Sequence, residues 1–424
     1  MNEMNDFSWL FLTFLGTGLL IDYWLNFRQQ NYVGSHASKV PEAFSDKITL
    51  DEHKKAAAYT FAKLKFNNIN LVIGSIVLIA LTLGGGIQYI FELTETLSLN
   101  PILKGTALIL ITMMIMSLIE IPMSAWNTFV LEENFGFNKE KPLGFVKDQL
   151  LNFALALIIG GPIIWVILWL MQISGEFWWL YAWMFWMSFT LIMMWAFPTY
   201  IAPLFNKFKP LEDGELRDRL SALLTRCGFE DNGMYIMDGS KRSSHGNAYF
   251  TGFGKNKRIV FYDTLLTQLT PLETEAVLAH ELGHFKRKHI LKRLVSITIL
   301  TLLGFALLGW LKDQSWFFSG LGVNQSSNAL ALLLFVFAMP VFSFFFQPIS
   351  SWFSRKHEFE ADDFATEQSS AADLITALVK LYRDNANTLT PDPIYSAFHH
   401  SHPPAPVRIA NISSKIYITF PKDV

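Results

Sequence analysis

The sequence HELGH at residues 280–284 brings together two histidines and a glutamate. On a helix, residues four apart project from the same face, so His280 and His284 can both bind one tetrahedral zinc ion. Glu281 lies beside them, where it can take a proton from a water molecule that the metal has acidified to a pKa of about 7. The pattern therefore indicates metal-assisted hydrolysis. A five-residue pattern also arises by chance, so its surroundings decide.

The residues before this pattern favour a helix. Thr270 can cap its N-terminus, Pro271 suits the first helical position, and Glu273 completes a capping box three residues after the cap. An apolar run at residues 276–279 then leads into the first histidine. We therefore expect both histidines on one helix whose other face is buried.

A zinc ion held by two histidines needs a further protein ligand and an open position for water. Residues 354–364 offer one, because Glu358 and Asp362 are four apart on a predicted helix. One carboxylate can bind the metal while the other accepts the free N–H of a ligating histidine. We expect one zinc ion per chain, with Glu358 as its third ligand, Asp362 as the acceptor and Glu360 pointing elsewhere. Without the histidines, a solvated acidic helix would explain this segment equally well.

The composition indicates a membrane protein. Of the 424 residues, 51% are hydrophobic and only 17% are charged, whereas about a quarter of residues are charged in soluble proteins. The formal net charge of −2 and the lack of a basic tail argue against a nucleic-acid partner. Cys227 is the single cysteine, which excludes an intrachain disulfide and a cysteine metal cluster.

The apolar residues gather in runs of about 20 residues, the length that a helix needs to cross the hydrocarbon core of a bilayer. Trp and Tyr cluster at their ends, as at residues 177–181, which is typical of a membrane interface. No small-residue cleavage pattern follows the first run, so we expect it to remain as an anchor. The predicted transmembrane spans are residues 7–26, 69–93, 104–125, 148–172, 177–203, 291–312 and 328–350.

Positive residues predict the orientation of these spans, because cytoplasmic loops are enriched in Lys and Arg. They gather after the first and third spans and are sparse after the second, fourth and sixth. The N-terminal residues 1–6 are then external, and the two long polar segments are cytoplasmic and can form one domain. The expected parts are a five-helix membrane region at 1–203, a protease segment with the HELGH helix at 204–290, transmembrane helices six and seven at 291–350, and a protease segment with the third ligand at 351–424.

The first polar segment is predicted to be mixed α/β. It contains an amphipathic stretch at residues 214–227 and strand-like runs at 234–237, 247–250 and 258–262, separated by Gly and Asp turns.

Several stretches of the chain resemble the Ste24-type CAAX prenyl protease family, one of the groups of membrane zinc peptidases that also include the HtpX-type quality-control proteases. The resemblance implies a mainly α, polytopic fold, in which seven transmembrane helices enclose a water-filled chamber and carry a cytoplasmic, gluzincin-like α/β protease domain. It also implies zinc bound by His280, His284 and Glu358, and cleavage near the C-terminus of prenylated proteins. The stretches are residues 55–60, 128–139, 201–206, 238–245, 280–284, 354–362 and 401–404.

The resemblance gives roles to two further groups of residues. His402 resembles the family histidine that steadies the oxyanion, with Arg408 as a supporting cation, and such donors contribute strongly to catalysis. Asn247, Ala248 and Tyr249 resemble the edge strand to which an extended substrate adds through main-chain hydrogen bonds. By themselves, the two groups would be a solvated loop and an ordinary strand.

The sequence is compatible with three functions. The first is a zinc endopeptidase in contact with membrane lipid, whose peptide or protein substrate carries a prenyl group under the family resemblance. The second is an HtpX-type quality-control protease, and the third a transporter with an accidental HELGH sequence, which the lack of an internal repeat disfavours. Compact polar segments, and no retrieval signal at residues 420–424, favour a bacterial inner membrane over the endoplasmic reticulum. The sequence does not indicate an oligomeric state.

Overall fold

The computed structural model describes residues 4–231, 233–251 and 258–419. The expectations for residues 1–3 and 420–424 lie outside these ranges. Among the described residues, seven helical stretches are long and apolar enough to cross a membrane, and each overlaps one predicted span. They are Asp6–His36, Leu50–Leu81, Pro101–Glu132, Pro142–Ile173, Gly175–Phe205, His289–Leu311 and Asn328–Gln368.

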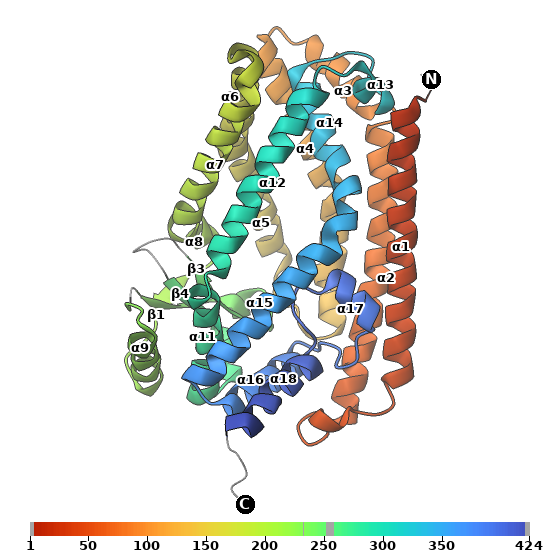
Figure 1. The fold of residues 1–424 in the computed structure, drawn as a ribbon. Helices are drawn as coiled ribbons and strands as arrows, with labels where there is room; N and C mark the ends of the chain where they lie inside the picture. The colour runs from red at the N-terminus through yellow and green to blue at the C-terminus, as the bar shows by residue number, and fades with distance from the viewer. Residues whose placement is uncertain (1–3, 232, 252–257, 420–424) are drawn as a thin grey trace, which may run out of the picture.

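These stretches form an elongated bundle, with the N-terminus at one end and the sheet and C-terminal helices at the other (Figure 1). Three of them contain a π-helical turn, at Asn127–Glu132, Ala156–Gly160 and Phe197–Ile201. The α-helices of the membrane region are α1 Asp6–His36, α2 Leu50–Leu81, α3 Gly86–Glu95, α4 Pro101–Trp126, α5 Pro142–Leu155, α6 Gly161–Ile173, α7 Trp178–Ala196, α8 Ala202–Phe205, α12 His289–Leu311, α13 Ser315–Gly320, α14 Asn328–Ser343 and α15 Gln347–Gln368.

One hydrophobic core closes the bundle at the end where the N-terminus lies. It joins the start of α1 to α3, α4, α6, α7, the end of α12, α13 and α14, with Phe11, Trp178 and Phe317 among its fully buried side chains. Beyond this core the bundle is hollow. Cavities of about 320, 440 and 400 Å³ follow one another, because the first two share Asn67 and the last two share Asn70. The chamber expected from the family resemblance is therefore present.

The second predicted span, residues 69–93, is wrong at both ends. α2 begins at Leu50, where Thr49 and Glu52 form a capping box. Many of the lysines that the prediction placed in the loop after the first span therefore lie on this helix. Hydropathy detects only the apolar part of such a helix. α2 ends at Leu81, and Gly85 adopts a left-handed conformation with φ of 78° before α3 begins. Glycine accepts this conformation without steric cost, so Gly85 separates the two helices.

The polar segments share one hydrophobic core beside α11 Pro271–Lys286, to which both contribute. Its sheet has the order β1-β2-β4-β3, with β2 and β4 parallel and both outer strands antiparallel to their neighbours. The predicted strands are confirmed to within one residue, and the short β1 was missed. The elements are β1 Phe208–Pro210, α9 Glu215–Cys227, β2 Met234–Met237, β3 Ala248–Thr251, β4 Arg258–Tyr262, α10 Asp263–Gln268, α16 Ala371–Asp384, α17 Pro393–His399 and α18 Ala405–Thr419.

Candidate metal centre

Helix α11 begins with the predicted capping box. Thr270 Oγ1 accepts the N–H of Glu273 at 3.3 Å, and Glu273 Oε2 accepts the N–H of Thr270 at 2.8 Å. The helix continues to Lys286 and carries all three residues of the pattern. The side chain of His280 is buried, and those of Glu281 and His284 are half-buried. Local sequence therefore fixes the helix that presents both histidines.

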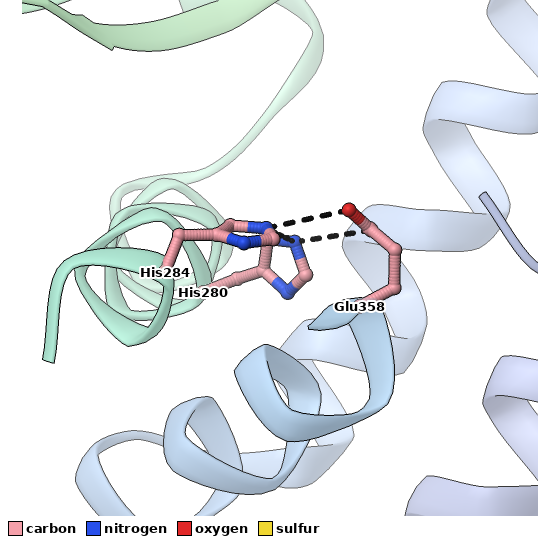
Figure 2. Close-up of side chains that lie close together, drawn as sticks. All are labelled: His280, His284 and Glu358. Carbon is pink, nitrogen blue, oxygen red and sulfur yellow. Dashed lines mark hydrogen bonds and ion pairs between the residues drawn. The ribbon is translucent and has the colours of Figure 1, made fainter. Parts of the chain in front are cut away.

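Helix α15 supplies the carboxylates and packs closely along α11. At the nearest point, a Cβ built on Gly283 would lie 2.9 Å from Ala361 Cα, so a larger residue would push the helices apart. Glu358 and Asp362 lie one turn apart on α15, and both are buried. Figure 2 shows His280 and His284 on one helix, facing Glu358 on the other.

Two imidazoles and one carboxylate converge at this point. One ligand atom from each of His280, His284 and Glu358 lies within 4.8 Å of the others. The Nε2 atoms of the histidines are 3.3 Å apart and lie 3.5 and 3.3 Å from the carboxylate oxygens of Glu358. Glu358 Oε2 is buried without a hydrogen-bond partner among the described residues. A carboxylate oxygen left in this state beside two imidazoles fits a divalent metal ion.

Asp362 lies directly behind His280. Its carboxylate is 2.9 Å from His280 Nδ1 and accepts two hydrogen bonds from Arg408, at 2.8 and 2.6 Å. Burial and the charge of Arg408 oppose protonation of His280, but the nearby carboxylates of Asp362 and Glu358 have the larger combined effect and raise its pKa to about 9. Asp362 thus holds the ring with Nε2 towards Glu358.

His402 and Arg408 approach the centre from the C-terminal segment. His402 Nε2 lies 3.4 Å from Glu358 Oε1, and its side chain is 65% exposed and lines the cavity of about 320 Å³. Arg408 is buried, and its guanidinium is bound by Asp362. His402 is therefore open to a bound molecule, whereas the position of Arg408 suits it to orienting Asp362.

The predicted substrate strand lies next to the HELGH helix. Ala248 and Tyr249 belong to β3, which is an edge strand, and Asn247 precedes it. Phe250 on β3 contacts Phe285 on α11, with ring centroids 4.1 Å apart. The structure therefore places β3 beside the helix that carries the two histidines.

Two residues near the centre, His289 and Glu360, were given no role at the site from the sequence. His289 Nδ1 lies 3.0 Å from His284 Nδ1, and its Nε2 lies 2.9 Å from Glu360 Oε2. His289 comes after the end of α11, so helical spacing from His284 does not place it. The left-handed residue Lys288, with φ of 59°, turns the chain and brings His289 back.

The fold and this centre together define a class of protein. Two histidines four apart on a helix, with a glutamate from a second helix, form the ligand set of a metallopeptidase. The surrounding apolar helices make the chain an integral, multi-pass membrane metallopeptidase.

Comparisons with known proteins identify the family. The profile of the CAAX prenyl protease N-terminal region, five membrane helices, matches residues 29–207, and that of peptidase family M48 matches residues 210–416. The CAAX prenyl protease 1 homolog of Dictyostelium discoideum is 36% identical over 93% of this chain and 94% of its own. CAAX prenyl protease 1 of Saccharomyces cerevisiae is 32% identical over 90% and 89%.

The crystal structure of S. mikatae Ste24p has the same fold, with a TM-score of 0.89 and 31% identity over 96% of this chain and 99% of that one. The chain belongs to peptidase family M48, with its CAAX prenyl protease 1 members. The family resemblance seen in the sequence is thereby confirmed, and the substrate is a peptide or protein.

Proposed function

We propose that the chain is a zinc endopeptidase that cleaves prenylated proteins near their C-terminus, at the cytoplasmic face of the membrane. The observation that carries the proposal is the convergence of His280, His284 and Glu358, with one carboxylate oxygen unsatisfied, at the end of a hollow helical bundle. Relatives that are named CAAX prenyl protease 1 support the choice of substrate.

The three converging residues would hold the ion. A bound zinc ion would act as a Lewis acid and lower the pKa of water at the site. Glu281 takes the proton of the attacking water and then passes it to the departing amine. His402 donates a hydrogen bond to the negative charge that develops on the carbonyl oxygen. Asp362 keeps His280 oriented throughout.

The edge strand and the hollow bundle would position the substrate. An extended peptide can pair with the open side of β3, which presents its scissile carbonyl to the metal centre. A prenyl group on the same peptide can lie among the apolar helices, where each buried CH₂ contributes about 0.8 kcal/mol. Affinity should therefore follow lipid length more than the identity of the last residues.

The lysine-rich segments after the first and third predicted spans contact the protease domain, which supports a cytoplasmic position of the site. Lys47 Nζ donates to Thr376 Oγ1 at 3.2 Å, and the N–H of Lys139 donates to the carbonyl of Arg242 at 3.0 Å. Segments rich in lysine thus touch the protease domain, and such segments favour the cytoplasm. The same orientation holds in a bacterial inner membrane, which the compact polar segments favour, and in the endoplasmic reticulum.

Metal content tests the proposed ligands. Purified protein should contain one zinc ion per chain by elemental analysis, and His280→Ala, His284→Ala or Glu358→Ala should lose it. Glu281→Gln should keep the zinc and lose nearly all peptide cleavage, because it removes the base and no ligand. Full zinc occupancy in Glu358→Ala would contradict the third ligand.

A matched pair of peptides tests the substrate. The enzyme in liposomes should cleave a farnesylated CaaX peptide faster than its unmodified twin, with Glu281→Gln as the blank. An enzyme that cuts neither peptide but degrades a misfolded membrane protein would be a quality-control protease instead.

A further inference from the structure

We propose that His289 and Glu360 form a hydrogen-bonded chain that fixes His284 in the tautomer and ring orientation that metal binding requires. The inference rests on the metal site proposed above. It assigns a positioning role to two residues that do not reach the ligand atoms themselves.

The two ring nitrogens of His284 have different neighbours. Its Nε2 faces Glu358 Oε1 at 3.3 Å, so Nε2 is the ligand atom and needs a free lone pair. In a neutral imidazole the proton is then on Nδ1. His284 Nδ1 lies 3.0 Å from His289 Nδ1, a distance at which one nitrogen must donate and the other accept. The N–H of His284 therefore donates, and His289 Nδ1 accepts.

His289 passes the hydrogen-bonded chain on to Glu360. Because its Nδ1 accepts, its proton is on Nε2, which lies 2.9 Å from Glu360 Oε2. The Nε2–H of His289 therefore donates to the carboxylate of Glu360. Lys292 Nζ lies 3.5 Å from the same carboxylate oxygen. Each donor in the chain meets an acceptor, so the carboxylate selects the tautomer of His289 and, through it, that of His284.

The arrangement matches the support of the other ligand. His280 Nδ1 meets the carboxylate of Asp362 directly at 2.9 Å, whereas His284 meets a carboxylate through one additional imidazole. Both carboxylates come from α15, which also carries Glu358. Such outer partners raise the basicity of a ligating histidine, and their loss typically lowers metal affinity by about 10–100-fold.

A neighbouring histidine provides a matched control. His357 stacks on His289, with ring centroids 4.1 Å apart and an interplanar angle of 15°. The hydrogen-bonded chain instead uses the two ring nitrogens of His289, which contact His284 and Glu360. His357→Ala therefore removes a ring contact of His289 and leaves both hydrogen bonds in place.

The test measures zinc affinity of the full chain in detergent, by competition with a chelator after the metal is stripped. His289→Leu should weaken zinc binding roughly 10–100-fold, and Glu360→Leu should weaken it similarly. His289→Asn should recover part of the loss, because its Oδ1 can accept from His284. Cobalt-loaded His289→Leu should also show a shifted d–d absorption band, which reports ligand geometry directly. His357→Ala should match the wild type in both measurements.

Two results separate the possible failures. If His289→Leu and Glu360→Leu keep the wild-type zinc affinity and cobalt spectrum while His284→Ala loses zinc, the hydrogen-bonded chain is overturned and the metal site stands. If the wild type binds no zinc, or His284→Ala binds it unchanged, the proposed metal site itself fails.

Discussion

Charged side chains at the proposed metal centre balance one another within a few ångströms. The buried carboxylates of Glu358 and Asp362 face Arg408, which is 3.7 Å from one and in a two-fold hydrogen bond with the other. His280 lies between both carboxylates, and they raise its pKa to about 9 after burial and Arg408 have opposed them. A proton on His280 therefore supplies part of the positive charge that a bound metal ion would supply. Metal and proton compete for this residue.

This competition predicts how zinc binding depends on pH. The pKa of His280 lies above its ordinary 6.5, so the metal-free protein holds a proton there at pH 7. That proton must leave before Nε2 can bind metal. Zinc affinity should rise between pH 6.5 and 9, by up to about tenfold per pH unit from this group. Calorimetric titration in buffers of different ionisation enthalpy counts the released proton.

The control for this prediction is Asp362→Asn, which removes one carboxylate that raises the pKa of His280 and should release fewer protons at pH 7. Equal zinc affinity at pH 6.5 and 8.5 in the wild type would contradict the competition.

At the scale of elements, the spacing between α11 and α15 sets the distance between the histidines and Glu358 that we propose as metal ligands. A Cβ on Gly283 would meet Ala361 Cα at 2.9 Å and Phe364 Cβ at 3.2 Å. Helix propensity alone would make Gly283→Ala stabilising by about 0.5–1 kcal/mol. Overpacking typically costs about 1–3 kcal/mol, and it moves Glu358 away from the histidines. We therefore expect Gly283→Ala to lower both the thermal midpoint and the zinc affinity.

Gly16→Ala on α1 is the matched control, because a Cβ there meets nothing within 4 Å. It should leave the thermal midpoint unchanged or raise it. If Gly283→Ala behaves like Gly16→Ala, close packing at Gly283 does not set the position of Glu358.

Elements with strong local signals were predictable from the sequence. The capping box of α11, the pairing of residues four apart on one helix, and the strand-like runs between Gly and Asp turns all depend on neighbours along the chain. The start of α2 was missed, because its first turns are charged and hydropathy does not detect them. His289 was missed because a left-handed residue, Lys288, brings it beside His284. Such placement depends on tertiary geometry that spacing does not encode.

At the scale of the whole molecule, polar contacts tie the hollow bundle to the protease domain. Glu132, in the π-helical turn that follows α4, accepts from Tyr59 on α2 at 2.6 Å and contacts His245 Nε2 at 3.2 Å. His245 Nδ1 lies 3.0 Å from Asn385 Oδ1, at the end of α16. Residue 248, three positions after His245, begins the edge strand. The membrane helices therefore hold the start of the strand that we propose for substrate binding.

This contact predicts that a change in the bundle alters peptide binding without loss of metal. In Glu132→Gln, a neutral amide replaces the carboxylate that Tyr59 and His245 now contact. Hydrogen bonds to a charged group contribute about 1.5–3 kcal/mol, against about 1 kcal/mol for neutral pairs, so the attachment at the start of β3 is weakened. We expect kcat/KM for a peptide substrate to fall roughly tenfold or more, mainly through KM, with zinc content unchanged.

Glu133→Gln makes the same chemical change at an exposed neighbour, whose Oε2 contacts only Asn138 among the described side chains, and it should retain wild-type kinetics. If the two variants have the same kinetics, the bundle does not position the edge strand through Glu132.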